Sequence, residues 1–189
     1  MKNRIAIFAS GGGTNAEEII RYFEKSKDAE VSLILSNKPD AFVLERAKNH
    51  NIPAYTFDRE EFRREGSVIP VLEEHGITHV VLAGFLWLVP EDLVNRYEGK
   101  IVNIHPALLP KYGGKGMYGM NVHKAVIEAG EEESGISIHF VNPVYDEGNI
   151  IFQARCKVEP NDTPESLAQK IHALEYAHYP RVIEEVIND

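Results

Sequence analysis

Arg4-Ile5-Ala6-Ile7-Phe8-Ala9 is an unbroken apolar run that passes directly into Ser10-Gly11-Gly12-Gly13-Thr14-Asn15. Such a run is typical of a central strand that is covered on both faces. The spacing of apolar residues then predicts a helix over residues 16–25. The order strand, glycine loop and helix lets backbone amides approach an anion at the start of the helix.

The glycine loop admits three interpretations. Gly11-x-Gly13-x-x-Ala16 fits a loose dinucleotide-binding pattern, but the next predicted strand, 31–35, ends in Ser36-Asn37 without the acidic residue that would bind a ribose 2′-hydroxyl, which disfavours NAD. No Gly-Lys-Ser/Thr is present, so this is not a Walker A loop. We favour a site for a single phosphate. The alternative is that Thr14 and Glu17 form a capping box that needs no ligand.

Helices and short apolar strands alternate through the first two thirds of the chain. Further strands are expected at residues 54–57, 79–83 and 100–102, and helices at 41–49, 59–75, from Pro90 onward and 121–129. This alternation predicts an α/β fold with a doubly wound, mostly parallel sheet.

The pattern changes in the C-terminal half. Apolar and polar residues alternate within 136–141 and again within 152–158, which predicts an antiparallel extension of the sheet. Thr163-Pro164 then supplies an N-cap and a proline at the first helical position. The helix that follows is expected to be interrupted near Pro180.

The composition is that of an ordinary globular protein. The 189 residues are 43% hydrophobic and 26% charged, with a formal net charge of -9, whereas a nucleic-acid surface normally shows a basic patch. No apolar run approaches the roughly 18 residues that a membrane span needs, and the first residues lack a signal-peptide pattern. We therefore expect one domain over residues 1–189, located in the cytoplasm, that binds neither nucleic acid nor membrane.

Neither a metal centre nor a cysteine-based site is expected. Among the eight histidines only His75 and His79 have the His-x-x-x-His spacing, and they fall in different predicted elements, the helix over 59–75 and the strand over 79–83; no Cys-x-x-Cys occurs. The single cysteine, Cys156, falls on the apolar phase of a predicted strand, so we interpret it as a core residue rather than a nucleophile. One cysteine also excludes an intramolecular disulfide and favours a reducing compartment.

Polar groups begin where the predicted strand over residues 100–102 ends. Asn103 and His105 lie two positions apart, so in extended geometry both side chains leave the same face. Pro106 keeps His105 out of a helix. An amide donor and an acid–base group at the carboxyl end of a strand lie where an open α/β sheet places its site.

Two further stretches join the candidate site. Gly84-Phe85-Leu86-Trp87-Leu88-Val89 is unusually apolar for a loop; it lines a ligand pocket or belongs to the core, and the sequence leaves both open. Asp146 lies in the connection between the two alternating strands. Asn103, His105 and Asp146 together resemble the catalytic trio of the folate-dependent formyltransferases, and the resemblance covers nearly the whole chain.

The resemblance implies a Rossmann-like formyltransferase fold with a phosphate-binding half (about 1–100) and a catalytic, folate-binding half (about 101–189). It implies that the phosphate of the acceptor is held by Gly13, Thr14 and Asn15, with Glu175 at the ribose and His172 nearby. It also implies a pterin site formed largely by backbone groups and an arginine contact to the folate; its residues would be Arg59, Leu86, Trp87, Leu88, Val89, Asn103, Asn142, Pro143, Val144 and Tyr145.

Two features depart from the family pattern. Well-known members read Met-Arg-Ile-Leu in the folate loop, where this chain has Leu86-Trp87-Leu88-Val89, so that Trp87 stands in place of arginine. The segment after Lys111-Tyr112 is several residues longer than in the family and is rich in glycine, which leaves the directions of Lys111, Lys115 and His123 open.

The reaction implied by the resemblance is transfer of formyl from N10 of 10-formyltetrahydrofolate to the amine of 5-phosphoribosylglycinamide (GAR), a step of de novo purine (IMP) biosynthesis that uses no metal and no ATP. Asn103 and a protonated His105 would stabilise the developing oxyanion. Asp146 would raise the pKa of His105 and relay a proton. The alternative is a related 10-formyltetrahydrofolate-dependent transferase or hydrolase with a different small acceptor. A monomer or weak homodimer is expected.

Overall fold

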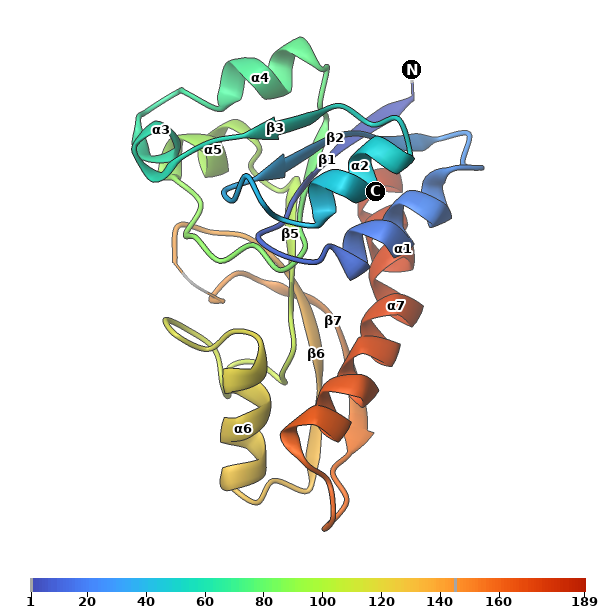
Figure 1. Ribbon diagram of the computed structural model, residues 1–189, viewed down its shortest axis with the longest axis vertical. Coiled ribbons are helices and arrows are strands. Elements are labelled where there is room, and N and C mark those ends of the chain that lie inside the picture. Colours follow the sequence, from blue (N-terminus) through green and yellow to red (C-terminus); the bar gives the residue numbers. More distant parts are fainter. Residues whose placement is uncertain (1, 145) are drawn as a thin grey trace.

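The computed structural model describes residues 2–144 and 146–189, which contain a seven-stranded sheet with helices on both faces (Figure 1). The strand order is β3-β2-β1-β4-β5-β6-β7. The strands are β1 (Asn3–Phe8), β2 (Ala29–Ser36), β3 (Ala54–Thr56), β4 (His79–Leu82), β5 (Ile101–His105), β6 (Glu133–Phe140) and β7 (Ile150–Lys157).

The pairing of the strands confirms the predicted fold class. β1 pairs in parallel with β2 and β4, β2 with β3, and β4 with β5. β6 runs antiparallel to both β5 and β7. The sheet is therefore doubly wound and mostly parallel, with an antiparallel extension in the C-terminal half.

Side chains on opposite faces of the sheet build two separate hydrophobic clusters. Along β1, Ile5 and Ile7 belong to one cluster and Ala6 and Phe8 to the other, as the two-residue period of a strand requires. The first cluster packs against α1 (Thr14–Phe23), α2 (Val43–Asn49), α6 (Met120–Glu128) and α7 (Pro164–Asn188). The second packs against α3 (Arg59–Arg63), α4 (Ile69–Glu74) and α5 (Glu91–Arg96).

The single helix expected over residues 59–75 is wrong. The segment forms two short helices, α3 and α4, because Arg64 adopts an extended backbone after α3 and Gly66 has a φ of +72°. The Gly66 amide donates to Asp92 Oδ2 over 2.6 Å, which ties the break to α5. Apolar residues have helical spacing on both sides of the break between α3 and α4, so the sequence pattern does not show where the helix ends.

The interruption expected near Pro180 is also wrong, because α7 runs unbroken from Pro164 to Asn188 with Pro180 inside it. The neighbouring Tyr179 is fully buried, and its hydroxyl lies 2.8 Å from the Leu82 carbonyl and 3.0 Å from that of Val102. This hydroxyl ties the helix to β4 and β5 beside the proline. Tertiary contacts therefore hold α7 together where the local sequence disfavours a helix.

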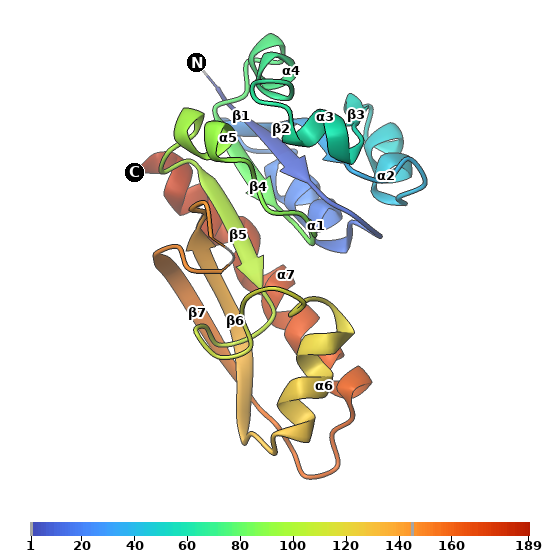
Figure 2. The same cartoon turned by 90° about the vertical axis from the view of Figure 1, so that its left-hand side faces the viewer.

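The strand directions determine where a ligand can bind. Figure 2 shows β1, β4 and β5 running in the same direction toward one edge of the sheet. The chain crosses from β3 to β4 on the other side of β1, so the topological switch point lies between β1 and β4. The glycine loop, the apolar loop and Asn103–His105 all lie at this edge. Within residues 2–144 and 146–189, no helix is long and apolar enough to span a bilayer.

Candidate active site

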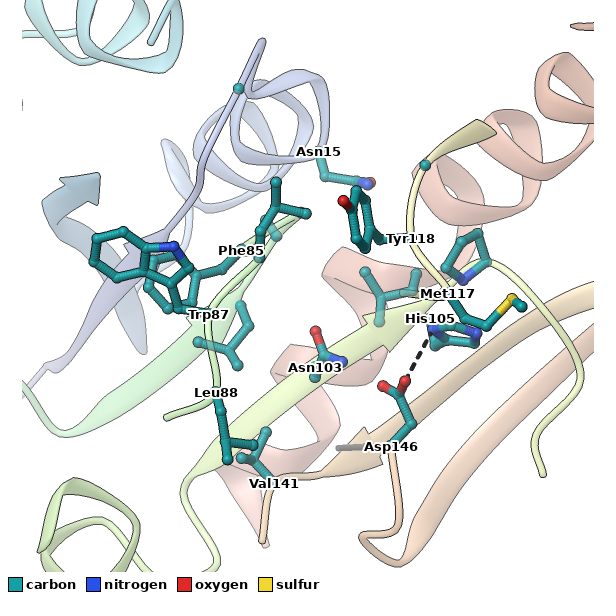
Figure 3. Close-up of a pocket in the computed structure, with 18 of the residues that line it drawn as sticks. Asn15, Phe85, Trp87, Leu88, Asn103, His105, Met117, Tyr118, Val141 and Asp146 are labelled. Atoms are coloured by element: carbon teal, nitrogen blue, oxygen red, sulfur yellow. Dashed lines mark ion pairs between the residues drawn. The ribbon is translucent and has the colours of Figure 1, made fainter. Parts of the chain in front are cut away.

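The segments that the sequence pointed to meet in one cavity of about 600 Å³ at the carboxyl edge of the sheet. A volume of this size suits a small-molecule site. The loop after β1, the loop after β4 and the end of β5 form its walls, and residues 114–119, Asp146 and α7 complete it. Figure 3 shows Asn103, His105 and Asp146 turned toward one another inside it.

The three predicted polar residues come together although Asp146 lies far from the other two in the chain. Asn103 and His105 both belong to β5 and point to the same face, as expected. The His105 Nδ1 lies 3.5 Å from Asp146 Oδ2, and its Nε2 donates to the Tyr112 carbonyl over 2.7 Å. In the neutral ring the lone pair is therefore on Nδ1, the atom that faces Asp146.

His105 is expected from the sequence to be protonated, but the net shift of its pKa is downward. Burial lowers the pKa of His105 below its usual value, and this outweighs the Asp146 carboxylate and the Tyr112 carbonyl, which both raise it. Asp146 thus acts in the expected direction but is too weak to dominate. At neutral pH and somewhat below it, the protonated fraction of His105 is therefore smaller than that of an ordinary histidine. The ring is better suited to take up a proton than to supply one.

Asp146 is held as a carboxylate. Burial opposes its charge, but the contacts with His139, His105 and the Gly114 amide together lower its pKa. Gly114 donates its N–H to Asp146 Oδ2 over 3.0 Å, and His139 Nε2 lies 3.6 Å from Oδ1. The backbone φ of Asp146 is +55°, a conformation that Asp and Asn tolerate better than most residues.

His139 belongs to the site and was not selected from the sequence. It stands opposite Asn103 in the β5–β6 register, and its Nδ1 lies 2.9 Å from the Phe140 carbonyl. Because a carbonyl can only accept, that nitrogen carries the hydrogen, and Nε2 of the neutral ring accepts from Asn103 Nδ2 over 3.0 Å. This bond fixes the orientation of the Asn103 amide. The one feature of the sequence that could have indicated its role is that His139 alternates with apolar residues in a predicted strand, on the side opposite to them.

Ser137 positions the loop that follows β5. Its hydroxyl donates to the Ala107 carbonyl over 2.7 Å and accepts from the Leu109 amide over 2.9 Å. Gln153 of β7 also donates to that hydroxyl, over 2.8 Å. The antiparallel extension therefore supports the backbone next to His105.

The glycine loop is shaped for an anion by contacts with α2. The Val43 amide and Arg46 Nε donate to the carbonyls of Gly11 and Gly12 over 3.1 and 2.7 Å. Gly13 has a φ of +69°, and a Cβ there would lie 2.5 Å from Val43 Cγ2, so the position requires glycine. With these carbonyls bonded to α2, the amides in the first turn of α1 remain for a ligand.

The capping-box alternative for this loop is wrong. α1 begins at Thr14 with Gly13 as its N-cap and without a side-chain cap. Glu17 instead accepts from Arg21 and Arg46 over 2.9 and 3.2 Å and lies 3.0 Å from His50 Nε2. Thr14 is exposed and lines the cavity.

Replacing Thr14 with alanine is expected to weaken binding of a phosphate ester such as ribose 5-phosphate by about tenfold, because a hydrogen bond to a charged group is lost. The free energy of unfolding should stay within about 0.5 kcal/mol of wild type. Thr163 provides the matched control, since its hydroxyl does cap a helix, α7. Thr163→Ala should cost about 1 kcal/mol of stability and leave ligand affinity unchanged. Calorimetry and thermal melts measure both; a loss confined to stability in Thr14→Ala would contradict a ligand role.

Glu175 and His172 reach the same cavity from α7. Glu175 Oε2 accepts from Asn15 Nδ2 over 2.9 Å, which links the last helix to the glycine loop. Burial raises the pKa of Glu175 from 4.5 to about 7, although the Asn15 bond opposes this. His172 is exposed and its ring stacks on Tyr176.

Glu175→Gln is expected to stabilise the protein at about pH 8 and to leave its stability unchanged at about pH 4. A carboxyl whose pKa rises on folding is destabilising once the pH exceeds its unfolded-state value, and the cost becomes constant above the folded-state value. The shift from 4.5 to about 7 corresponds to on the order of 3 kcal/mol. Denaturant unfolding across pH measures the difference, with the exposed Glu98→Gln as control. Equal stabilisation at both pH values would contradict a raised pKa.

The apolar loop after β4 serves both the core and the cavity. Phe85 and Trp87 pack against the second hydrophobic cluster, Val89 is buried within it, and Leu88 is 40% exposed at the cavity. The two alternatives that the sequence left open therefore both hold. The loop is anchored because the Leu86 amide donates to Ser10 Oγ over 3.0 Å.

The remaining predicted residues are placed as follows. Arg59 lies over the Trp87 ring, with its guanidinium carbon 5.7 Å from the ring centroid, and both line the cavity together with Asn142 and Val144. Of the described residues named for the folate site, Val89 and Pro143 do not line the cavity. Tyr145 lies outside the described residues.

The glycine-rich segment over residues 113–119 follows the trio residues of β5 in the chain and contributes residues 114–119 to the lining of the cavity. Lys111 points outward and pairs with Glu131 over 2.9 Å, whereas Lys115 and His123 line the cavity. Burial, together with the neighbouring His172 and His105, lowers the pKa of His123 to about 4. Among the residues that the structure describes, no cluster of three or more His, Cys, Asp or Glu side chains suits a metal ion.

Comparison with known proteins gives the same picture over almost the whole chain. A family model described as formyl transferase matches residues 3–183. The chloroplastic phosphoribosylglycinamide formyltransferase of Arabidopsis thaliana is 42% identical over 96% of this chain, which spans 64% of that relative's length. The Bacillus subtilis phosphoribosylglycinamide formyltransferase is 36% identical over 97% of this chain and 94% of its own length. A crystal structure of phosphoribosylglycinamide formyltransferase from Bacillus halodurans matches with a TM-score of 0.89 at 39% identity, covering 98% of this chain and 95% of that one.

Proposed function

Because the chain belongs to the formyl transferase family, we propose that it transfers a formyl group from 10-formyltetrahydrofolate to the amine of GAR, a step of purine biosynthesis. The observation that carries this proposal is the convergence of Asn103, His105 and Asp146 in the same cavity as the glycine loop. A phosphate site and an acid–base group at opposite ends of one cavity fit a phosphorylated amine. The relatives named phosphoribosylglycinamide formyltransferase support the choice of acceptor.

The wall formed by the apolar loop fits the folate. Leu88 and Val144 are 40% and 49% exposed, and both line the cavity where a flat ring could cover them. Phe85 and Trp87 line the cavity as well, and the Arg59 guanidinium lies over the indole. An apolar slot with a cation at its rim suits a pterin ring followed by an anionic glutamyl tail.

Each residue of the trio has a distinct role in the proposed reaction. The folate supplies the formyl group, and its carbonyl oxygen gains negative charge when the amine adds. Asn103, oriented by His139, donates a hydrogen bond to that oxygen. His105, largely neutral beforehand, accepts the proton that the amine loses.

Asp146 lets His105 carry that proton. Its carboxylate lies 3.5 Å from His105 Nδ1, the ring atom that bears the lone pair, so it stabilises the imidazolium as it forms. His105 keeps its positive charge until it passes the proton to N10 of the folate, the nitrogen that leaves. Burial and Asp146 have opposite effects on the His105 pKa, which keeps the ring able both to accept and to return a proton.

The acceptor end is formed by two elements that are distant in sequence. Gly13, Thr14 and Asn15 surround the proposed phosphate position, and Glu175 faces the ribose next to Asn15. These residues and the trio line one cavity, and the proposal includes a single formyltransferase domain over 1–189 that acts as a monomer or weak homodimer.

A coupled spectroscopic assay with 10-formyltetrahydrofolate and GAR, run without ATP or added metal, tests the function. The expected result is loss of the formyl donor and equimolar formation of formylated GAR. Loss of formyl only to water, or only to another amine, would instead support a hydrolase or a transferase with a different acceptor. Absence of turnover with folding intact would overturn the proposal.

A further inference from the structure

The glycine-rich segment after His105 places one tyrosine at the acceptor end of the cavity. Gly114 and Gly116 have φ values of +90° and +88°, and two backbone bonds tighten the turn, from the Met117 amide to the Gly114 carbonyl and from the Tyr118 amide to that of Gly116. The Gly114 amide also donates to Asp146 Oδ2. The segment is therefore attached to the catalytic carboxylate at its start.

The other end of the segment is fixed by α6. The Asn121 amide donates to the Tyr118 carbonyl over 3.2 Å, and Asn121 Nδ2 lies 3.3 Å from the Gly116 carbonyl. Tyr118 is thus held between two anchored turns, yet its side chain is 50% exposed. Within residues 2–144 and 146–189, its hydroxyl makes no hydrogen bond with a side chain or the backbone.

Tyr118 lines the cavity opposite the glycine loop. Figure 3 shows its ring directed across the cavity toward Asn15, with Asn103 and Asp146 farther in and Leu88 on the other side. The tyrosine is therefore at the phosphate end of the site and not at the apolar wall proposed for the folate. A phenol hydroxyl in this position can donate to phosphate oxygens.

We propose that Tyr118 is an acceptor-binding residue whose hydroxyl donates a hydrogen bond to the phosphate of a ribose 5-phosphate ester, while its ring covers the ribose opposite Asn15. The assignment rests on the proposed function and adds to it a contact from the segment in which this chain departs from the family pattern. Because the same segment bonds to Asp146 through Gly114, an acceptor held by Tyr118 lies beside the catalytic trio.

Tyr118→Phe tests the hydroxyl, because it removes one oxygen and keeps the ring. The KM for GAR is expected to rise about tenfold, the typical value of a hydrogen bond to a charged group, with kcat and the KM for 10-formyltetrahydrofolate unchanged. Titration calorimetry should show weaker binding of ribose 5-phosphate and no change for ribose. Tyr118→Ala should raise the KM for GAR further. The matched control is Tyr22→Phe, which removes a hydroxyl bonded to Glu184 away from the cavity.

The outcomes separate this assignment from the proposed function. Unchanged values for both GAR and ribose 5-phosphate in Tyr118→Phe would overturn the role of Tyr118 while the wild-type assay still supported formyl transfer. A rise in the KM for the folate alone would place the tyrosine at the other substrate and also overturn it. If wild type does not formylate GAR, the proposed function fails, and the ribose 5-phosphate titration still decides whether Tyr118 binds a phosphate.

Discussion

Replacing His105 with alanine is expected to lower kcat for formyl transfer by about 10²- to 10⁴-fold, the usual contribution of one acid–base group. The KM values for both substrates should change little, because the ring acts on the transferred proton and not on binding. His75→Ala is the control and should retain wild-type turnover, because His75 lies at the end of α4 and is not among the residues that line the cavity. Steady-state kinetics on folded protein measure the effect; a loss expressed only as a raised KM would contradict the proton-transfer role.

Asp146→Asn tests how the carboxylate next to His105 affects the proton that His105 accepts. Asparagine keeps the shape and tolerates the φ of +55°, so the change removes charge with little strain. Because the carboxylate raises the His105 pKa against burial, its loss lowers that pKa further. A base must be unprotonated to act, so the acidic limb of the pH–rate profile should move to lower pH while kcat falls. The exposed Asp40→Asn should leave the profile unchanged.

The limb that moves identifies the role of His105. If the alkaline limb moved to lower pH instead, His105 would be acting as a protonated donor, as the family resemblance first suggested. The double variant His105→Ala/Asp146→Asn should cost much less than the product of the two single losses, because the two residues act as one unit. Multiplicative losses would contradict the coupling.

Asn103→Ala is expected to lower kcat by about 10²- to 10³-fold, the usual loss for one donor aimed at a developing oxyanion. Asn103→Asp should be at least as damaging, because it keeps the size and places a negative charge where the reaction creates another. The contact with His139 over 3.0 Å means that His139→Ala should reproduce part of the loss by releasing the amide. The exposed Asn49→Ala is the control for asparagine removal.

Circular dichroism and thermal melts separate these effects from misfolding. If Asn103→Ala kept wild-type kcat, the amide would have only a structural role in the β5–β6 pair. If Asn103→Asp were fully active, charge at that position would not matter and the oxyanion assignment would fail.

Local patterns were sufficient to predict the fold and to place Asn103 and His105 on one face of a strand. Apolar runs separated by helical spacing are caused by burial on both faces of a parallel sheet, so they predict strand type directly. The two-residue period placed Asn103 and His105 on one face, and β5 shows both in the strand. The position of Asp146 came only from the resemblance, because nothing local determines how the loop after β6 returns to β5.

The features that were missed depend on contacts between distant residues. The His139–Asn103 bond requires the β5–β6 register, which a single strand does not specify. The continuity of α7 through Pro180 depends on Tyr179 and its two carbonyl partners. The net pKa of His105 depends on how deeply the folded chain buries the ring, and a sequence contains no measure of that depth.

The bond between Asn15 and Glu175 joins residues 160 positions apart and has a consequence for synthesis of the protein. The glycine loop leaves the ribosome before its partner on α7, which follows after on the order of 10 s at usual elongation rates. Throughout that interval the acceptor end of the cavity lacks one wall. A nascent chain can therefore assemble its parallel strands well before it can hold a nucleotide-like ligand, and the acceptor end of the cavity is complete only once α7 has been translated.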